Sequence, residues 1–213
     1  MNADKLQAKV YAGYGKAAQR IGPLCQLYRP LSPTAPLANQ LAPLYASFNA
    51  EDFSYMRPNK YAKPTWFCVA DGRLLAVGDY LVDPLGKTWF IAALQTILPI
   101  LAVDCNRTIS MRRPQRQTGN GRLGYNGDTA ANETILMSGW PASVLQGTKG
   151  EKSETNLPGD TRSPWWTVLL PAWPGVVLRS ADIITDDLER RYVISSAELT
   201  DLGWRITAAQ AQT

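Results

Sequence analysis

The sequence contains no histidine. Histidine is the side chain that titrates closest to neutral pH and the commonest metal ligand, so its absence removes the usual general base and the usual metal site together. No nucleophile motif takes its place. The sequence therefore predicts a protein that is not an enzyme and that has no catalytic residue, no cofactor and no metal ion.

Cysteine and long apolar runs are also scarce. The three cysteines, Cys25, Cys68 and Cys105, form no Cys-x-x-Cys motif, which favours reduced thiols over a disulfide framework or a zinc site. The longest apolar run, residues 91–103, is interrupted by Gln95 and is too short to span a bilayer. With no signal-peptide pattern at the start, we expect a soluble globular protein without a membrane partner.

The net charge of +4 is unevenly distributed along the chain. Residues 1–125 carry 15 Lys/Arg against 7 Asp/Glu, whereas residues 126–213 carry 7 against 11. A basic half and an acidic half suit subunits that stack on one another, because complementary potentials orient association. A nucleic-acid-binding face is the alternative explanation.

An apolar stripe predicts a helix over residues 3–21. Its members recur at intervals of three or four residues, as the helical period requires: Leu6, Val10, Tyr14, Ala17 and Ile21. Gly22 and Pro23 end the pattern. We interpret residues 1–22 as a helical arm that docks against another element.

Two segments repeat one pattern. Residues 79–93 read DYLVDPLGKTWFIAA and residues 182–196 read DIITDDLERRYVISS, so both aspartates recur, with Leu85 as Leu188 and Ile91 as Ile194. We also match residues 24–28 with 142–146 and residues 64–70 with 164–170, the second copy being longer around Trp173. These matches indicate an internal duplication.

A final alternating strand closes each half, through Val103, Cys105, Ile109 and Met111 in the first and Trp204, Ile206 and Ala208 in the second. About five short strands per copy bury enough apolar surface only if the sheet closes on itself. We predict a mainly β protein of two tandem small barrel-like modules, SH3-like or OB-like, with an N-terminal helix.

The predicted boundaries are residues 23–113 for the first module, 114–135 for a Gly/Arg-rich linker and 136–213 for the second module. Residues 29–63 form a long loop of the first module, and we expect a neighbouring molecule to order it. That loop carries aromatic residues that are unusual in disordered chain: Tyr45, Phe48, Phe53 and Tyr55.

The aspartates of the repeated segment match turn chemistry. Asp83, Pro84 and Gly86 occupy the positions that these residue types prefer in a type I turn. Asp186 stands at the start of the second turn, which lacks the proline and the glycine. We therefore assign Asp83 and Asp186 to turns and not to a pair of catalytic carboxylates.

Arginine and tryptophan supply the candidate interaction residues. Five arginines follow one another without an intervening acid, as a phosphate-binding segment or a contact with an acidic subunit would require: Arg107, Arg112, Arg113, Arg116 and Arg122. Adjacent strand residues point to opposite faces, so Trp165 and Trp166 cannot both enter one core, and one is expected to meet a partner. The proposed interface comprises Trp165, Trp166, Trp173, Tyr45, Phe48, Phe53, Tyr55, Arg112, Arg113, Arg116 and Arg122.

Three long stretches, GYGKAAQRIGPLCQLYRP, LPGDTRSPWWTVLLPA and DDLERRYVISSAELTDLGWR, resemble virion proteins of tailed bacteriophages. An N-terminal helix before small β modules is similar to head completion, head–tail connector and tail adaptor proteins. The resemblance implies a structural subunit of the virion, assembled in the host cytoplasm, that forms a homo-oligomeric ring or collar. Its partners would be portal, tail-tube or other virion proteins.

Two other functions stay open at this point. One is a nucleic-acid-binding β-barrel whose arginine segment follows a phosphate backbone. The other is a capsid decoration or fibre-attachment protein.

Overall fold

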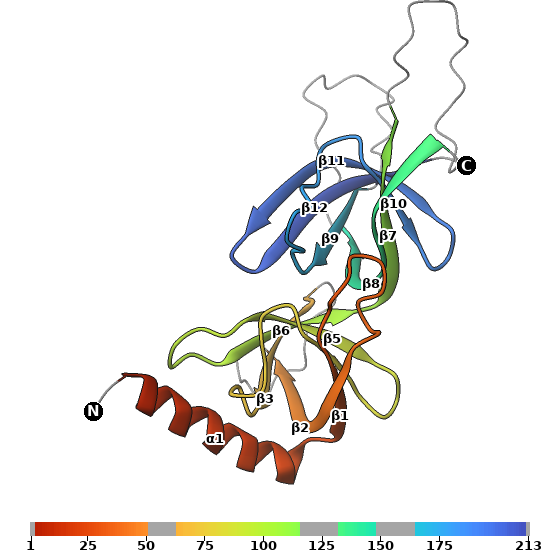
Figure 1. Ribbon diagram of the computed structural model, residues 1–213. Helices are drawn as coiled ribbons and strands as arrows, with labels where there is room; N and C mark the ends of the chain where they lie inside the picture. Colours follow the sequence, from red (N-terminus) through yellow and green to blue (C-terminus); the bar gives the residue numbers. More distant parts are fainter. Residues whose placement is uncertain (1–2, 51–62, 116–131, 148–164, 212–213) are drawn as a thin grey trace, which may run out of the picture.

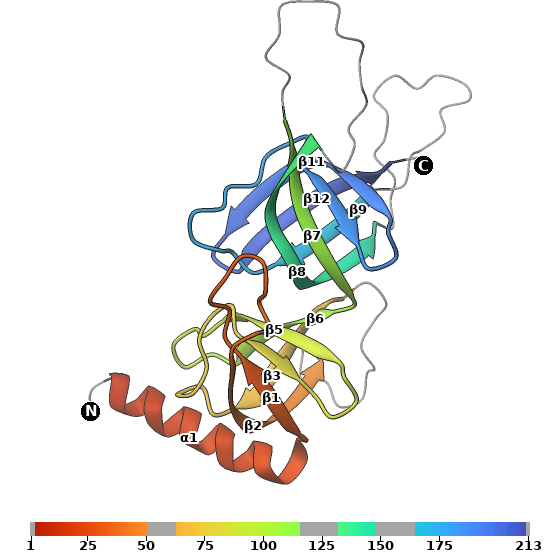
Figure 2. The same ribbon diagram turned by 45° about the vertical axis from the view of Figure 1, so that its right-hand side comes forward.

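The computed structural model describes residues 3–50, 63–115, 132–147 and 165–211. One helix, α1 (Ala3–Ile21), precedes two closed antiparallel barrels of six strands each in this part of the chain (Figures 1 and 2). The first barrel comprises β1 (Leu24–Tyr28), β2 (Gln40–Ala50), β3 (Thr65–Ala70), β4 (Tyr80–Val82), β5 (Thr88–Ala93) and β6 (Ile100–Cys105). The second comprises β7 (Arg107–Pro114), β8 (Glu133–Gln146), β9 (Trp165–Leu170), β10 (Ile183–Asp186), β11 (Arg191–Thr200) and β12 (Gly203–Gln210).

Both barrels have the same strand order. Around the first barrel the order is β1-β2-β3-β6-β5-β4, and around the second it is β7-β8-β9-β12-β11-β10, so each strand has a counterpart six positions later. The register agrees as well, since Tyr80 pairs with Phe90 in the first barrel as Ile183 pairs with Val193 in the second. The prediction of two tandem barrels with an N-terminal helix is confirmed, and the shared topology supports their origin by duplication.

The boundary between the barrels differs from the predicted one. Strand β7 belongs to the second barrel, so Asn106 alone connects the two, and the predicted modules 23–113 and 136–213 are corrected accordingly. The alternating residues of β6 and β7 resemble one strand because the chain passes almost without interruption from one barrel into the next. The ends of the predicted linker 114–135 are strand, because Pro114 ends β7 and residues 133–135 begin β8, and its residues 116–131 fall outside the described residues.

Two further strand assignments are corrected. Strand β2 lies inside the segment predicted to be a loop, residues 29–63, which gives six strands per barrel instead of five. Residues 142–146 form the end of β8 and therefore correspond to β2, whereas the counterpart of β1 is β7. The sequence match failed here because both copies are apolar strands of similar length.

The new boundary also removes the charge asymmetry. Divided at Asn106, residues 1–106 carry 10 Lys/Arg against 7 Asp/Glu, and residues 107–213 carry 12 against 11. Residues 1–106 and 107–213 thus have net charges of +3 and +1, and the +3 of the first part equals the net charge of helix α1. Complementary charge between a basic and an acidic half therefore gives no basis for stacking subunits.

Each barrel is filled by residues at matching register positions. The first core includes Cys25, Leu27, Leu81, Ile91 and Ile100, and the second includes Ile109, Met111, Ile184, Ile194 and Ile206. The three cysteines are unpaired thiols. Burial raises the pKa of the Cys25 thiol to about 11, which keeps it protonated and unreactive.

The two barrels share one apolar cluster and form a single body. Outward-facing residues of the first barrel, Tyr80 and Phe90, pack in the same cluster as Trp140 of the second. The Tyr80 hydroxyl donates a hydrogen bond of 2.9 Å to the Pro141 carbonyl, and the Tyr80 and Trp140 rings meet edge to face at 6.1 Å. The barrels are stacked end to end, with α1 at the far end of the first (Figures 1 and 2).

Helix α1 docks on β2 and β3 through a narrower face than predicted. Tyr11 and Ala18 are buried, while Ala17 and Ile21 of the predicted stripe are exposed. The Tyr11 ring lies flat over Gly72, where a Cβ atom would come within 2.7 Å of it, and this contact sets the rotation of the helix. The helix covers an end of the first barrel in the way that the first barrel covers the second.

The repeated turns have the same hydrogen bonds, which confirms the turn role of Asp83, Pro84 and Gly86. The Asp83 carboxylate accepts from the amides of Leu85 and Lys87, at 2.9 and 2.8 Å. Asp186 accepts from Leu188 and Arg190 in the same way. Gly86 has φ of +83°, and Glu189 in the second turn adopts the same left-handed region with φ of +61°.

We expect Glu189→Gly to raise the free energy of unfolding by about 0.5–1 kcal/mol, because a residue with a Cβ atom is strained in the left-handed region. Gly86→Ala in the equivalent turn is the matched control and should lower stability by about 1 kcal/mol. Urea unfolding measures both. A Glu189→Gly protein less stable than the parent would contradict this account of the turn.

Candidate functional site

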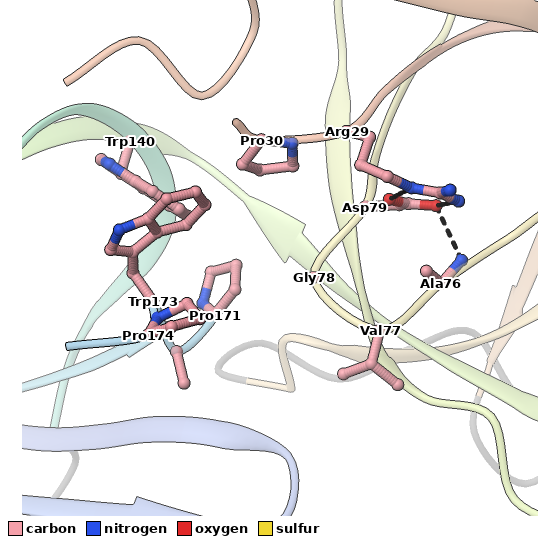
Figure 3. Close-up of a pocket in the computed structure, with 11 residues that line it drawn as sticks. Arg29, Pro30, Ala76, Val77, Gly78, Asp79, Trp140, Pro171, Trp173 and Pro174 are labelled. Atoms are coloured by element: carbon pink, nitrogen blue, oxygen red, sulfur yellow. Dashed lines mark hydrogen bonds and ion pairs between the residues drawn. The ribbon is translucent and has the colours of Figure 1, made fainter. Parts of the chain in front are cut away.

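A pocket of about 220 Å³ lies between the barrels. We call it the seam pocket. Its first-barrel wall contains Arg29, Pro30, Val77 and Asp79, and its second-barrel wall contains Trp140, Pro171, Trp173 and Pro174 (Figure 3). Apolar rings from the second barrel thus face an ion pair from the first across the space.

Trp140 anchors the second-barrel wall. Only 1% of its surface is exposed, and its indole N–H donates a 2.6 Å hydrogen bond to the carbonyl of Pro33 in the first barrel. The Trp173 ring packs edge to face on Trp140, with centroids 5.8 Å apart. These contacts hold the two rings in place, so the wall exists before any ligand or partner arrives.

Arg29 and Asp79 form a two-pronged ion pair on the opposite wall. Arg29 donates from Nε and Nη2 to the two carboxylate oxygens of Asp79, at 2.8 and 2.7 Å. The amide of Ala76 donates to the same carboxylate at 2.7 Å. The Asp79 side chain is 1% exposed and the Arg29 side chain 40%, so a buried carboxylate is neutralised by a guanidinium that reaches solvent.

The same ion pair recurs in the second barrel. Arg113 donates to both oxygens of Asp182, each at 2.8 Å, and the Arg179 amide completes the arrangement at 2.8 Å. In both copies the arginine also reaches a carbonyl of the loop before the aspartate, that of Leu74 or Val177. These repeated aspartates are therefore each paired with an arginine and hold the loop between the third and fourth strands of their barrel.

Asp186 is a further structural carboxylate. Burial alone would raise its pKa, but hydrogen bonds from the Arg190 side chain and amide and from the Tyr192 hydroxyl outweigh this effect and hold the pKa of Asp186 below its usual value. The group stays ionised and pins the β10–β11 turn. Its role is thus the predicted one, with Arg190 and Tyr192 as additional partners.

The seam pocket depends on a loop that differs between the barrels. Residues 171–174, Pro-Ala-Trp-Pro, stand where the first barrel has Asp-Gly-Arg-Leu at 71–74. In the first barrel Asp71 and Arg73 pair with each other at 2.5 Å. The apolar wall is therefore specific to the second barrel. The sequence indicates this difference, because the second copy is longer around Trp173.

The predicted tryptophans have separate environments. Trp166 packs against the shared cluster and contacts the Tyr192 ring at 5.5 Å, with the Arg190 guanidinium over its face. Trp165 points to the other side of β9 and lies against Gly147. Trp173 is the one that lines the seam pocket, which makes it the best placed of the three for a partner contact.

Of the aromatic residues of the predicted loop, two lie on strand β2 and two lie outside the described residues. Tyr45 and Phe48 lie on β2, where Tyr45 is exposed and Phe48 stacks on Trp89 with ring centroids 3.8 Å apart. Phe53 and Tyr55 lie outside the described residues. Their proposed interface role stays a prediction.

The described arginines of the basic segment meet carboxylates from distant parts of the chain. Arg113 pairs with Asp182, Arg107 lies 3.8 Å from Asp187, and Arg112 lies 4.0 Å from Glu133. No acidic residue separates these arginines in the sequence, but in the folded protein carboxylates compensate their charge. Arg116 and Arg122 fall outside the described residues.

The sequence-based prediction missed most of the seam pocket. Of its residues, only Trp173 had been proposed as a contact. A usable signal was present, since Arg-Pro at 29–30 recurs at 113–114 and both arginines pair with an aspartate of the repeated segment. A duplicated arginine and a duplicated aspartate could have been paired before the structure was known.

Searches against protein-family models, curated proteins and solved structures returned no match. Among the described residues, no helix is long and apolar enough to cross a membrane. The same residues contain no cluster of three or more potential metal-binding side chains.

Proposed function

We propose that the protein is a non-enzymatic structural subunit of a tailed-phage virion, forming a homo-oligomeric ring or collar at the head–tail or tail-adaptor region. The seam pocket is the observation that carries the proposal. Its second-barrel wall is tryptophan and proline, its first-barrel wall joins Val77 to the Arg29–Asp79 ion pair, and its volume of about 220 Å³ is below the roughly 300–1,000 Å³ of typical small-molecule sites. Such a preformed pocket, apolar on one wall and with an ion pair on the other, suits one side chain of a protein partner.

The stacked barrels support the same proposal. They share an apolar cluster and are joined by Asn106 alone, so the subunit presents its surfaces in a defined orientation. The buried aspartates Asp79, Asp182 and Asp186 are each paired with an arginine that holds a loop or turn. The resemblance of three long stretches to phage virion proteins adds the location, in contact with portal or tail-tube proteins.

The location can be tested on purified virions encoded by the genome that carries this gene. Antibodies against the purified protein are expected to label the junction of head and tail in electron micrographs. Labelling of the capsid surface or the fibres would favour the decoration or fibre-attachment alternative. Absence of the chain from virions by mass spectrometry would overturn the proposal.

Nucleic-acid binding is the alternative from a different class, and it is favoured by the net charge of +3 on helix α1. Filter binding of duplex and single-stranded DNA across a salt series separates the two. A connector is expected to retain almost no DNA at any salt concentration. Strong retention that falls steeply as salt rises would show phosphate contacts and favour the alternative.

A further inference from the structure

Leu85 is the most exposed large apolar side chain among the described residues, with 93% of its surface in water. It lies at the tip of the β4–β5 turn, where its own amide donates to the Asp83 carboxylate at 2.9 Å and Gly86 donates to the Asp83 carbonyl at 3.0 Å. Pro84 restricts the turn further. Leu85 is therefore a rigid apolar knob that loses little conformational freedom on binding.

The seam pocket has an apolar wall that matches Leu85 in character, opposite the Arg29–Asp79 ion pair. Trp173 and Pro174 face Val77 across it, and the two walls belong to one body because the barrels share a core (Figure 3). Val77, at the rim, is 56% exposed. The pocket therefore has an open mouth, and its volume is suited to a leucine side chain and not to a large ligand.

Charge is complementary around the knob and the hole. The half-exposed carboxylate of Asp83 lies beside Leu85, and its described hydrogen bonds from Leu85 and Lys87 both use Oδ1. At the pocket, the described contacts of Arg29 use Nε and Nη2, and with 40% of its side chain exposed the guanidinium also reaches solvent. A carboxylate that accompanies the knob can meet this guanidinium at the rim.

We propose that Leu85 of one copy inserts into the seam pocket of a second copy. Within one chain, strand β4 separates the knob from the pocket, and Leu85 is exposed. Because knob and hole are different patches of the same surface, the contact is head-to-tail and closes into a ring or extends into a filament. The inference rests on the proposed function as a self-assembling subunit and names the surfaces that join.

The internal duplication supplies a matched control. Leu188 occupies the equivalent position on the β10–β11 turn but is only 53% exposed. It stands between Asp187 and Glu189, where the first turn has Pro84 and Gly86. Asp187 and Glu189 would bring two charged side chains directly beside the inserted leucine, against the Trp173 and Pro174 wall, so Leu188 is expected to be dispensable for assembly.

Sedimentation velocity over a concentration series tests the contact. The parent chain is expected to self-associate, Leu85→Ser and Val77→Glu each to weaken association by about 10- to 100-fold, and Leu188→Ser to leave it unchanged. All three side chains are exposed, so the variants should keep the parent's circular dichroism and unfolding midpoint. Undiminished association of Leu85→Ser, or loss of association in Leu188→Ser alone, would overturn the inference.

Cysteine cross-linking identifies the surfaces directly. Leu85→Cys mixed with Val77→Cys should form an intermolecular disulfide under mild oxidation, whereas Leu188→Cys mixed with Val77→Cys, and the parent chain alone, should not. A ring that forms without this cross-link would refute the knob-in-pocket contact and leave the proposed function standing. A parent chain that stays monomeric at the highest concentration and is absent from virions would refute both.

Discussion

Replacing Arg29 with methionine is expected to lower the free energy of unfolding by about 3–5 kcal/mol, the usual effect of leaving a buried charge without its partner. Methionine keeps the apolar stem of arginine and removes the guanidinium. The Asp79 carboxylate, 1% exposed, would then retain only the Ala76 amide at 2.7 Å among its described donors. Urea unfolding of the parent and the variant measures the difference.

Asp79→Asn is the informative comparison. It removes the charge from the buried partner and leaves the guanidinium of Arg29, which at 40% exposure can be hydrated. We expect a smaller loss, about 1–3 kcal/mol. The double variant Arg29→Met, Asp79→Asn should be more stable than Arg29→Met alone, because no buried charge remains. If Asp79→Asn proves more damaging than Arg29→Met, burial of the carboxylate is not what makes the pair necessary.

The second barrel repeats the experiment within the same molecule. Arg113 and Asp182 have the same geometry, with both distances at 2.8 Å, and Asp182 is buried as Asp79 is. Arg113→Met should therefore be more harmful than Asp182→Asn by a similar margin. A different order in the two barrels would show that the seam pocket, which only the first pair adjoins, contributes to the effect.

Local patterns were enough to predict the barrels. The repeated segment 79–93 and 182–196 is built from residues whose roles are decided within a few positions: turn aspartates, and alternating apolar residues such as Ile91 and Ile194 that enter the two cores. A repeated hairpin with one buried face requires a closed sheet on each copy. Fold class follows from such short-range requirements.

Such local patterns could not predict the boundary between the two barrels or the ion pairs that the arginines form. Strands β6 and β7 have similar patterns, and only their hydrogen-bonded neighbours, β5 for one and β8 for the other, assign them to different barrels. Likewise Arg113 is separated from Asp182 by 69 positions. Pairings at such separations leave no local signal, and only the recurrence of Arg-Pro together with the repeated aspartate in both copies points to them.

The seam pocket depends both on a local sequence feature and on the stacking of the two barrels. The proline- and tryptophan-rich loop at 171–174 was visible as an insertion relative to the first copy, but its position opposite Val77 and Arg29 follows from the stacking of the barrels. Stacking depends on Tyr80 and Phe90, which face outward and are nevertheless buried. In a single isolated barrel these two side chains would be exposed to solvent.

Trp140→Ala is expected to have the largest effect of any single core substitution in the second barrel, about 3–5 kcal/mol. Trp140 is among the largest fully buried side chains, and it touches Tyr80 of the first barrel as well as Trp173. Its removal leaves a cavity at the seam and takes one of two hydrogen bonds from the Pro33 carbonyl, which keeps the bond from the Ser138 amide. The parent should unfold in one cooperative transition because the barrels share this cluster.

In Trp140→Ala the two barrels should lose that coupling. Hydrogen exchange is expected to show β7–β12 opening at a lower free energy than β1–β6, whereas in the parent both sets open together. Leu44→Ala is the matched control, because Leu44 pairs with Cys25 as Trp140 pairs with Ile109 but lies in the core of the first barrel alone. It should cost about 2–5 kcal/mol and weaken chiefly β1–β6. Joint opening of all twelve strands in Trp140→Ala would mean that the coupling runs through Asn106 and the remaining seam contacts, and that the tryptophan only fills space.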